Sequence, residues 1–93
     1  MILDERDVEG YLTAKVEAAG GQCIKLGQDG WPDRIVVLPH GRIIWCELKQ
    51  PHGKPAALQL YRKKILERLG CSVYLCYTKK EADAMLGEIK RTE

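Results

Sequence analysis

The segment from Gly30 to Lys49, GWPDRIVVLPHGRIIWCELK, constrains the fold of this chain more than any other stretch. It holds two runs rich in β-forming residues, 34–38 and 42–48, joined by the turn-like sequence Pro39-His40-Gly41. This pattern predicts a β-hairpin. The second run is apolar on both faces, which is typical of a strand that is covered on both sides of its sheet.

Charged residues interrupt the end of that apolar strand. Glu47 and Lys49 are two residues apart, so their side chains point to the same face of the predicted sheet. Removing a charge from water without a partner costs roughly several kcal/mol, so these two charges need a specific reason. Asp33 precedes the first strand. A strict two-residue loop would place Asp33 opposite Leu48, on the wrong face, and we therefore expect a longer loop, a bulge or a bend beside Asp33.

The segments around the hairpin alternate between helix and strand patterns. Residues 4–19 have the helical apolar stripe Val8, Leu12, Val16 and Ala19, and residues 22–26 alternate like a strand. A helix is expected to open at Pro55 or Ala56 and to end at Leu69 before Gly70, with the apolar stripe Leu58, Tyr61, Ile65 and Leu69. Residues 72–77 read as a fourth strand. Thr78 and Glu81 form a capping box for a last helix, from 79 to about 90.

This order, α-β-β-β-α-β-α, predicts a single small α/β domain over residues 1–93, with a mixed four-stranded sheet flanked by helices. Apolar residues make up 45% of the chain and charged residues 30%, as in a soluble globular protein. No apolar stretch is long enough to cross a bilayer and no signal-peptide pattern is present, so we expect a cytoplasmic location. The four cysteines form no CxxC pair and no cluster of zinc type, which favours buried, reduced thiols.

Charge is distributed unevenly along the chain. Residues 1–33 hold seven acidic and three basic side chains, whereas the remaining residues hold six acidic and twelve basic ones. A basic half suits a protein that meets a polyanion, although the net charge of +2 would be too small to indicate nucleic acid by itself. Solvated helix surfaces are often basic as well, so this feature leaves both interpretations open.

The three polar side chains at the hairpin ends suggest a reaction. Two carboxylates on neighbouring strands about 4.8 Å apart can hold a hard cation such as Mg²⁺, which keeps several waters. The metal would polarise a phosphoryl group and offset the charge that develops as the ester bond breaks. Lys49 could position or deprotonate the attacking water, or neutralise the pentavalent oxyanion. The alternative is an ordinary ion pair between Glu47 and Lys49.

These residues also carry a family resemblance. Pro32-Asp33 followed by Glu47-Leu48-Lys49 looks like the signature of the PD-(D/E)xK nucleases, whose core has a restriction-endonuclease-like fold and a similar α-β-β-β-α-β order. More closely, the chain resembles the virus-type replication-repair nuclease (VRR-NUC) family over about residues 5–78. The residues that match this family are Glu9, Gly30-x-Pro-Asp33, Glu47-Leu-Lys49 and Leu58-Gln59.

The resemblance implies a role for each matching position. Asp33 and Glu47 would be metal-binding carboxylates, the backbone carbonyl of Leu48 a further ligand, and Lys49 the catalytic lysine. Glu9 would approach the Mg²⁺ or Mn²⁺ ion directly or through water, and Gln59 would lie beside the site. By helical geometry Glu9 lies on the edge of its apolar stripe, although a solvated glutamate in a first helical turn is the simpler interpretation.

The implied function is a metal-dependent DNA endonuclease that hydrolyses phosphodiester bonds of branched DNA, such as Holliday junctions, in replication, recombination or repair. The chain would act as a homodimer in the cytoplasm of a bacterium or of a phage-infected cell, because two sites on a two-fold axis can cut two strands. The candidates for phosphate contacts are Lys54, Arg34, Arg62 and Lys63. One alternative is a non-catalytic nucleic-acid-binding module of the same fold. Another is a structural or redox domain that uses its cysteines, against which the absence of CxxC argues.

Overall fold

The computed structural model describes residues 5–28, 30–49 and 56–91, and it shows the predicted order of elements. The elements are α1 (Glu5–Ala18), β1 (Gln22–Lys25), β2 (Arg34–Leu38), β3 (Arg42–Leu48), α2 (Ala57–Arg68), β4 (Ser72–Cys76) and α3 (Lys79–Arg91). The predicted boundaries agree with these within one or two residues, apart from the start of α1, where residues 1–4 lie outside the described part. The predicted α/β order is therefore confirmed.

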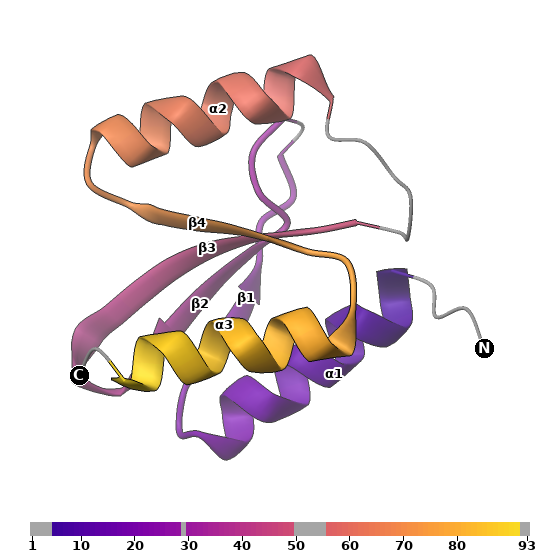
Figure 1. Cartoon of the computed structure of the whole chain (residues 1–93), viewed down its shortest axis with the longest axis vertical. Coiled ribbons are helices and arrows are strands. Elements are labelled where there is room, and N and C mark those ends of the chain that lie inside the picture. Colours follow the sequence, from indigo (N-terminus) through magenta and orange to yellow (C-terminus); the bar gives the residue numbers. More distant parts are fainter. Residues whose placement is uncertain (1–4, 29, 50–55, 92–93) are drawn as a thin grey trace.

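The four strands form one mixed sheet in the order β1-β2-β3-β4. The neighbours β1 and β2, and β2 and β3, are antiparallel, whereas β3 and β4 are parallel. Helix α2 connects the parallel pair and covers one face of the sheet, while α1 and α3 lie side by side on the opposite face (Figure 1). We call these the α2 face and the α1/α3 face. None of the described helices is both long and apolar enough to span a bilayer.

The main hydrophobic core lies on the α1/α3 face. The α1 stripe is buried as predicted at Val8, Leu12 and Val16, which have no exposed surface, whereas Ala19 is exposed just beyond the helix. From α3, Ala82 and Met85 complete this core. In the sheet, β2 and β3 contribute every second residue, as strand geometry requires, and β4 contributes its last one; these residues are Val36, Leu38, Ile44, Cys46, Leu48 and Cys76.

The apolar stripe predicted for α2 is wrong. Leu58, Tyr61 and Leu69 are 46%, 56% and 75% exposed, and the buried residue of this helix is Leu66 instead. The side of α2 that faces the sheet carries Gln59 as well. Polar residues face the sheet because that side of α2 borders the candidate site, so the hydrophobic pattern pointed to the solvent-exposed side of this helix.

The hairpin loop has three residues, and this length sets the register of the site. Pro39–Gly41 form a short 3-10 turn in which His40 and Gly41 adopt positive φ angles of 70° and 74°. The closing pair is Leu38 with Arg42, so Arg34 pairs with Cys46. One step further, Asp33 corresponds to Glu47 rather than to Leu48. Of the expected alternatives, the longer hairpin loop is thus confirmed.

All four cysteines are free thiols, in agreement with the prediction, but only two of them are buried. Cys46 and Cys76 lie in the core with their sulfur atoms 3.6 Å apart, whereas Cys23 and Cys71 are half-buried. The hydrogen bond to Cys76 and the burial of the side chain raise the pKa of Cys46 well above its usual range. A thiol in this state is a packing residue and not a nucleophile.

Candidate functional site

The candidate site lies where β2 begins and β3 ends. These two ends are adjacent because the strands are antiparallel, and the register brings Asp33 to the level of Glu47. Glu47 is only 3% exposed, and among the described side chains it is the one charged side chain that is buried. Like charges directly opposite on neighbouring strands are unfavourable. Two carboxylates held at this place therefore point to a function rather than to stability.

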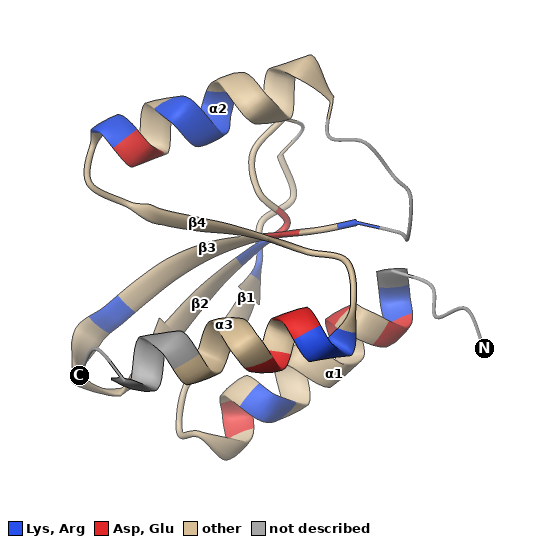
Figure 2. Ribbon diagram, in the orientation of Figure 1, with Lys and Arg blue, Asp and Glu red and all other residues tan. Residues whose placement is uncertain are grey.

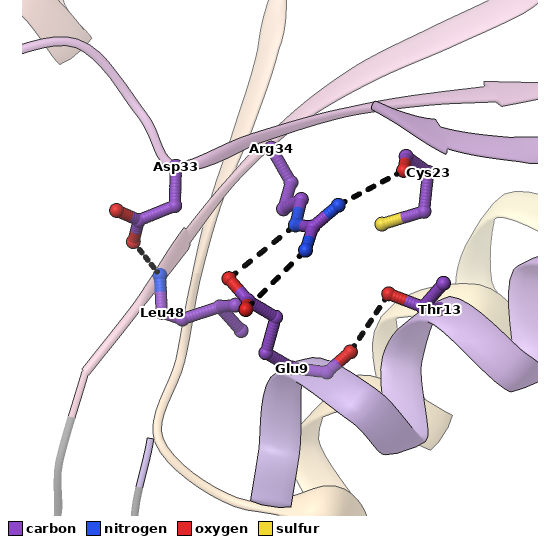
Figure 3. Close-up of polar contacts among 6 residues, drawn as sticks. All are labelled: Glu9, Thr13, Cys23, Asp33, Arg34 and Leu48. Atoms are coloured by element: carbon purple, nitrogen blue, oxygen red, sulfur yellow. Dashed lines mark hydrogen bonds and ion pairs between the residues drawn. The ribbon is translucent and has the colours of Figure 1, made fainter. Parts of the chain in front are cut away.

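A backbone hydrogen bond fixes Asp33 against β3. Its Oδ2 accepts a hydrogen bond of 2.8 Å from the N–H of Leu48 (Figure 3). In an antiparallel ladder the N–H and C=O of one residue point to the same side of the strand. The carbonyl of Leu48 therefore points toward Asp33 as well. The Oδ1 atom of Asp33 accepts no hydrogen bond from the residues that the structure describes, so it is available for a ligand.

Lys49 continues the β3 ladder by one residue. Its N–H donates a hydrogen bond of 2.9 Å to the carbonyl of Cys76 in β4. Alternation along the strand then directs its side chain to the α2 face, with that of Glu47. The side chain of Lys49 is half-buried. The ion pair between Glu47 and Lys49 stays an alternative to a catalytic role.

Helix α2 closes the site from above the sheet. A small pocket on the α2 face is lined by Glu47 and Gln59 together with Pro32, Leu60, Lys63, Val73 and Leu75. The Oε1 atom of Gln59 accepts a hydrogen bond of 3.0 Å from the N–H of Ala56. This bond uses the carbonyl oxygen of the amide, so the remaining polar group of the side chain is its N–H₂ donor. The structure thus brings Gln59 next to Glu47.

Glu9 has a different environment. Its carboxylate forms a two-pronged ion pair with Arg34, with distances of 3.3 Å from Nε to Oε2 and 3.3 Å from Nη2 to Oε1 (Figure 3). Arg34 also donates a hydrogen bond of 3.1 Å to the carbonyl of Cys23. Because Arg34 pairs with Cys46, both side chains of the ion pair belong to the α1/α3 face. Glu9 is thus near the start of β2, but across the sheet from Glu47.

The predicted phosphate contacts have unequal surroundings. Arg34 is only 15% exposed and is engaged by Glu9, while Lys54 lies outside the described residues. Lys63 borders the pocket and forms an ion pair of 2.9 Å with Glu67. Figure 2 shows that basic residues predominate along the later turns of α2, whereas α1 and α3 carry both signs. The phosphate contacts at these four positions stay predictions.

Arg62 lies on an aromatic ring. Its guanidinium carbon is 4.5 Å from the centroid of the Trp31 ring, and the ring of Trp45 is 6.5 Å further on, tilted by 37°. The Nε atom of Arg62 is buried and has no hydrogen-bond partner in the described chain. Sequence analysis gave Trp31 no role. The sequence signal for a role of Trp31 is its position two residues before Asp33. Its contact with Arg62 is visible only in the structure.

The donor set at the strand ends fits a hard divalent cation. Within the described residues, no three His, Cys, Asp or Glu side chains are grouped closely enough to bind a metal by themselves. Mg²⁺ does not need such a group, because it is held by one or two carboxylates and keeps waters or substrate phosphate oxygens as its other ligands. Asp33, Glu47 and the carbonyl of Leu48 supply three oxygen donors of this kind.

Known proteins are similar to this chain in sequence and in fold. No family model matches the chain. The chain is 39% identical over 75 residues to the phage protein named "Putative nuclease p44" from Acyrthosiphon pisum secondary endosymbiont phage 1. The aligned region covers 77% of this chain and 81% of that protein. It is also similar to a solved structure described as a VRR_NUC domain. That similarity has a TM-score of 0.82 and 32% sequence identity, over 89% of this chain and 94% of the other.

Proposed function

Because the chain belongs to the VRR-NUC family of nucleases, we propose that it is a divalent-metal-dependent DNA endonuclease whose site lies at the ends of β2 and β3. The observation that carries this proposal is the register that aligns Asp33 with Glu47, with the Leu48 carbonyl beside them. We further propose that residues 1–93 act as one nuclease domain in the cytoplasm. The catalytic group comprises Asp33, Glu47, Lys49, Gln59 and Glu9.

The carboxylates of Asp33 and Glu47 and the carbonyl of Leu48 would hold Mg²⁺ or Mn²⁺. When bound, the ion supplies Lewis-acid stabilisation of the charge that develops on the phosphate. The hydrogen bond from the Leu48 N–H directs Oδ2 of Asp33 away from the ligand, which leaves Oδ1 for it. The burial of Glu47 keeps its carboxylate in an environment where electrostatic interactions are strong.

Lys49 and Gln59 act on the reacting groups. Lys49, on the same face as Glu47, places its ammonium beside the phosphate, where it orients the attacking water or neutralises the oxyanion. Gln59 donates an N–H to the water or to a non-bridging phosphate oxygen, because its carbonyl oxygen is occupied by Ala56. Glu9 supports the site from the opposite face, through Arg34 or through water.

The substrate that we propose is branched DNA, cut by a homodimer. Two identical sites related by a two-fold axis match the symmetry of a four-way junction, in which two strands must be cut. Lys54, Arg34, Arg62 and Lys63 are proposed as contacts to phosphates, which add affinity without sequence specificity. A shift in the salt dependence of binding by about one charge in Lys54→Ala would support that assignment.

Three single variants test the catalytic assignment. In Asp33→Asn, Glu47→Gln and Lys49→Ala, the cleavage of a labelled four-way junction in Mg²⁺ is expected to fall about 10³-fold or more. Asp33→Asn and Glu47→Gln remove a charge with little change in volume, and Lys49→Ala shortens a half-buried side chain just beyond the end of β3. Folding and junction binding in Ca²⁺ are therefore expected to persist, which circular dichroism and gel shifts measure.

The matched control is Lys64→Ala, which removes an exposed lysine of α2 outside the pocket. It is expected to cleave like the parent. A site variant that cleaves at the parental rate would remove that residue from the mechanism. Labelled flap and duplex substrates, run beside the junction, test the preference for branched DNA separately from catalysis.

A further inference from the structure

We propose that Arg62 is a positioning residue: stacked on Trp31, it holds the segment before Asp33 in place and so sets the affinity of the site for its metal ion. This inference rests on the proposed metal-dependent function. It gives Arg62 a role within the protein in place of the phosphate contact considered above, and the two roles differ in what each predicts for a variant.

The stacking contact joins α2 to the segment that leads into β2. The 4.5 Å distance from the guanidinium carbon to the Trp31 centroid lies within the range of a cation–π interaction. Trp31 is only two residues from Asp33, and Pro32 between them has a fixed φ angle. Movement of the indole would therefore be transmitted to the Asp33 backbone. The neighbouring Trp45 of β3 limits that movement, since its ring lies 6.5 Å away.

Two further contacts act on the same segment. Gly30 has a φ angle of +83°, and a Cβ at this position would lie 2.5 Å from a methyl group of Leu58. Helix α2 thus approaches the backbone as closely as a glycine allows. Pro32 is buried and lines the pocket beside Gln59. Residues 30–32 therefore lie beside the first half of α2, at Leu58, Gln59 and Arg62.

The surroundings of Arg62 favour this internal role over binding to DNA. Its Nε is buried without a hydrogen-bond partner in the described chain, so the side chain is placed by stacking and not by polar contacts. A phosphate contact by a guanidinium that already lies over an indole would be a second function. Lys64, on the same helix, is exposed and supplies an equal charge without a stacking contact.

The test compares Arg62→Gln with Lys64→Gln, which each remove one positive charge from α2. Calorimetric titration with Mn²⁺ in the absence of DNA is expected to show metal binding weakened about tenfold in Arg62→Gln and unchanged in Lys64→Gln. The salt dependence of junction binding in Ca²⁺ is expected to be the same in both variants. Parental Mn²⁺ affinity in Arg62→Gln, with a reduced salt slope, would overturn the inference and restore the phosphate contact.

A double-mutant cycle makes the result independent of general damage to the fold. Trp31→Leu is expected to weaken Mn²⁺ binding as Arg62→Gln does, and the double variant is expected to be no weaker than the weaker single variant, because both remove the same contact. Additive losses would contradict the stacking route. If the parent binds no Mn²⁺, the proposed metal-dependent function itself fails, whereas binding by the parent with equal binding by Arg62→Gln would refute only the positioning role.

Discussion

The two faces of the sheet differ in the side chains that they bury. The α1/α3 face is a continuous apolar core in which Leu12 and Cys46 have no exposed surface. The α2 face carries a buried carboxylate, a pocket lined by both polar and apolar side chains, and a helix on which Leu60, Tyr61 and Leu69 are exposed. The comparison indicates that stability comes mainly from one face and that the other is free to hold polar groups in positions that folding alone would not favour.

Each face also has a pair of polar side chains near the start of β2. On the α1/α3 face, Glu9 and Arg34 have opposite charges and satisfy one another. On the α2 face, Asp33 and Glu47 have the same charge. Opposite charges stabilise one another, whereas like charges aligned on neighbouring strands repel, and a cation bound between them would offset that repulsion. The difference distinguishes a structural pair from a ligand-binding pair at the same level of the sheet.

The largest expected effect concerns the core face. Leu12→Ala removes a fully buried side chain and is expected to lower the free energy of unfolding by about 3 kcal/mol. Leu69→Ala, at the exposed end of α2, is expected to cost less than about 1 kcal/mol. Urea denaturation followed by circular dichroism measures both. Similar losses in the two variants would show that the faces contribute equally, contrary to the comparison.

A smaller effect is expected from the structural pair. Arg34→Met leaves the carboxylate of Glu9 without its cation and is expected to destabilise the fold by about 2 kcal/mol. Adding Glu9→Gln to that variant is expected to recover part of the loss, because no charge is then left alone. Denaturation of the two single variants and the double variant measures the coupling.

The same variants define the role of Glu9. With Glu9→Gln alone, a loss of cleavage much larger than the loss of stability would place Glu9 in the catalytic group. Parental cleavage together with lowered stability would restrict Glu9 to its ion pair with Arg34.

The smallest effect concerns the core thiols. The pKa of Cys46 is raised by its hydrogen bond to Cys76 and by burial, so its thiolate is absent at pH 8 and it is expected not to react with a thiol reagent in the native state. Because the pKa of Cys46 is higher in the folded than in the unfolded protein, the protonated thiol stabilises the fold below about pH 8.5, and this stabilisation is lost as the pH rises further. Cys46→Ala should leave the native thiol count unchanged, whereas Cys71→Ala should lower it. A lower thiol count in Cys46→Ala would show that the Cys46 thiol is accessible to solvent and would contradict its burial in the core.

The sequence predicted much of this arrangement because its hairpin is locally encoded. Strand periodicity, the turn residues and the charges at positions 33, 47 and 49 predict the hairpin and a candidate site at its ends, and the register argument requires the longer loop that Pro39–Gly41 provide. The orientation of α2 could not be predicted, since Leu58 and Leu69 form a regular apolar stripe that faces solvent. A hydrophobic pattern predicts that the apolar side of a helix is buried. In α2, polar residues such as Gln59 lie on the side that faces the sheet.

Contacts between distant residues were also beyond the sequence. The ion pair of Glu9 with Arg34 spans 25 positions, and the stacking of Arg62 on Trp31 joins a loop to a helix that follows two strands later. Both depend on how α1 and α2 cross the sheet. Charge and spacing identify such residues as candidates, but only the packed structure shows which partner each one takes.

The account depends most directly on a cation bound between the strand ends. Crystals of the parent grown with Mn²⁺ and measured at a wavelength where manganese scatters anomalously would locate the ion. The expected peak lies within coordination distance of the Asp33 and Glu47 carboxylates and the Leu48 carbonyl, and it is expected to disappear in Asp33→Asn. A peak elsewhere, or one at the same place in both proteins, would contradict the assignment of these carboxylates as the metal site.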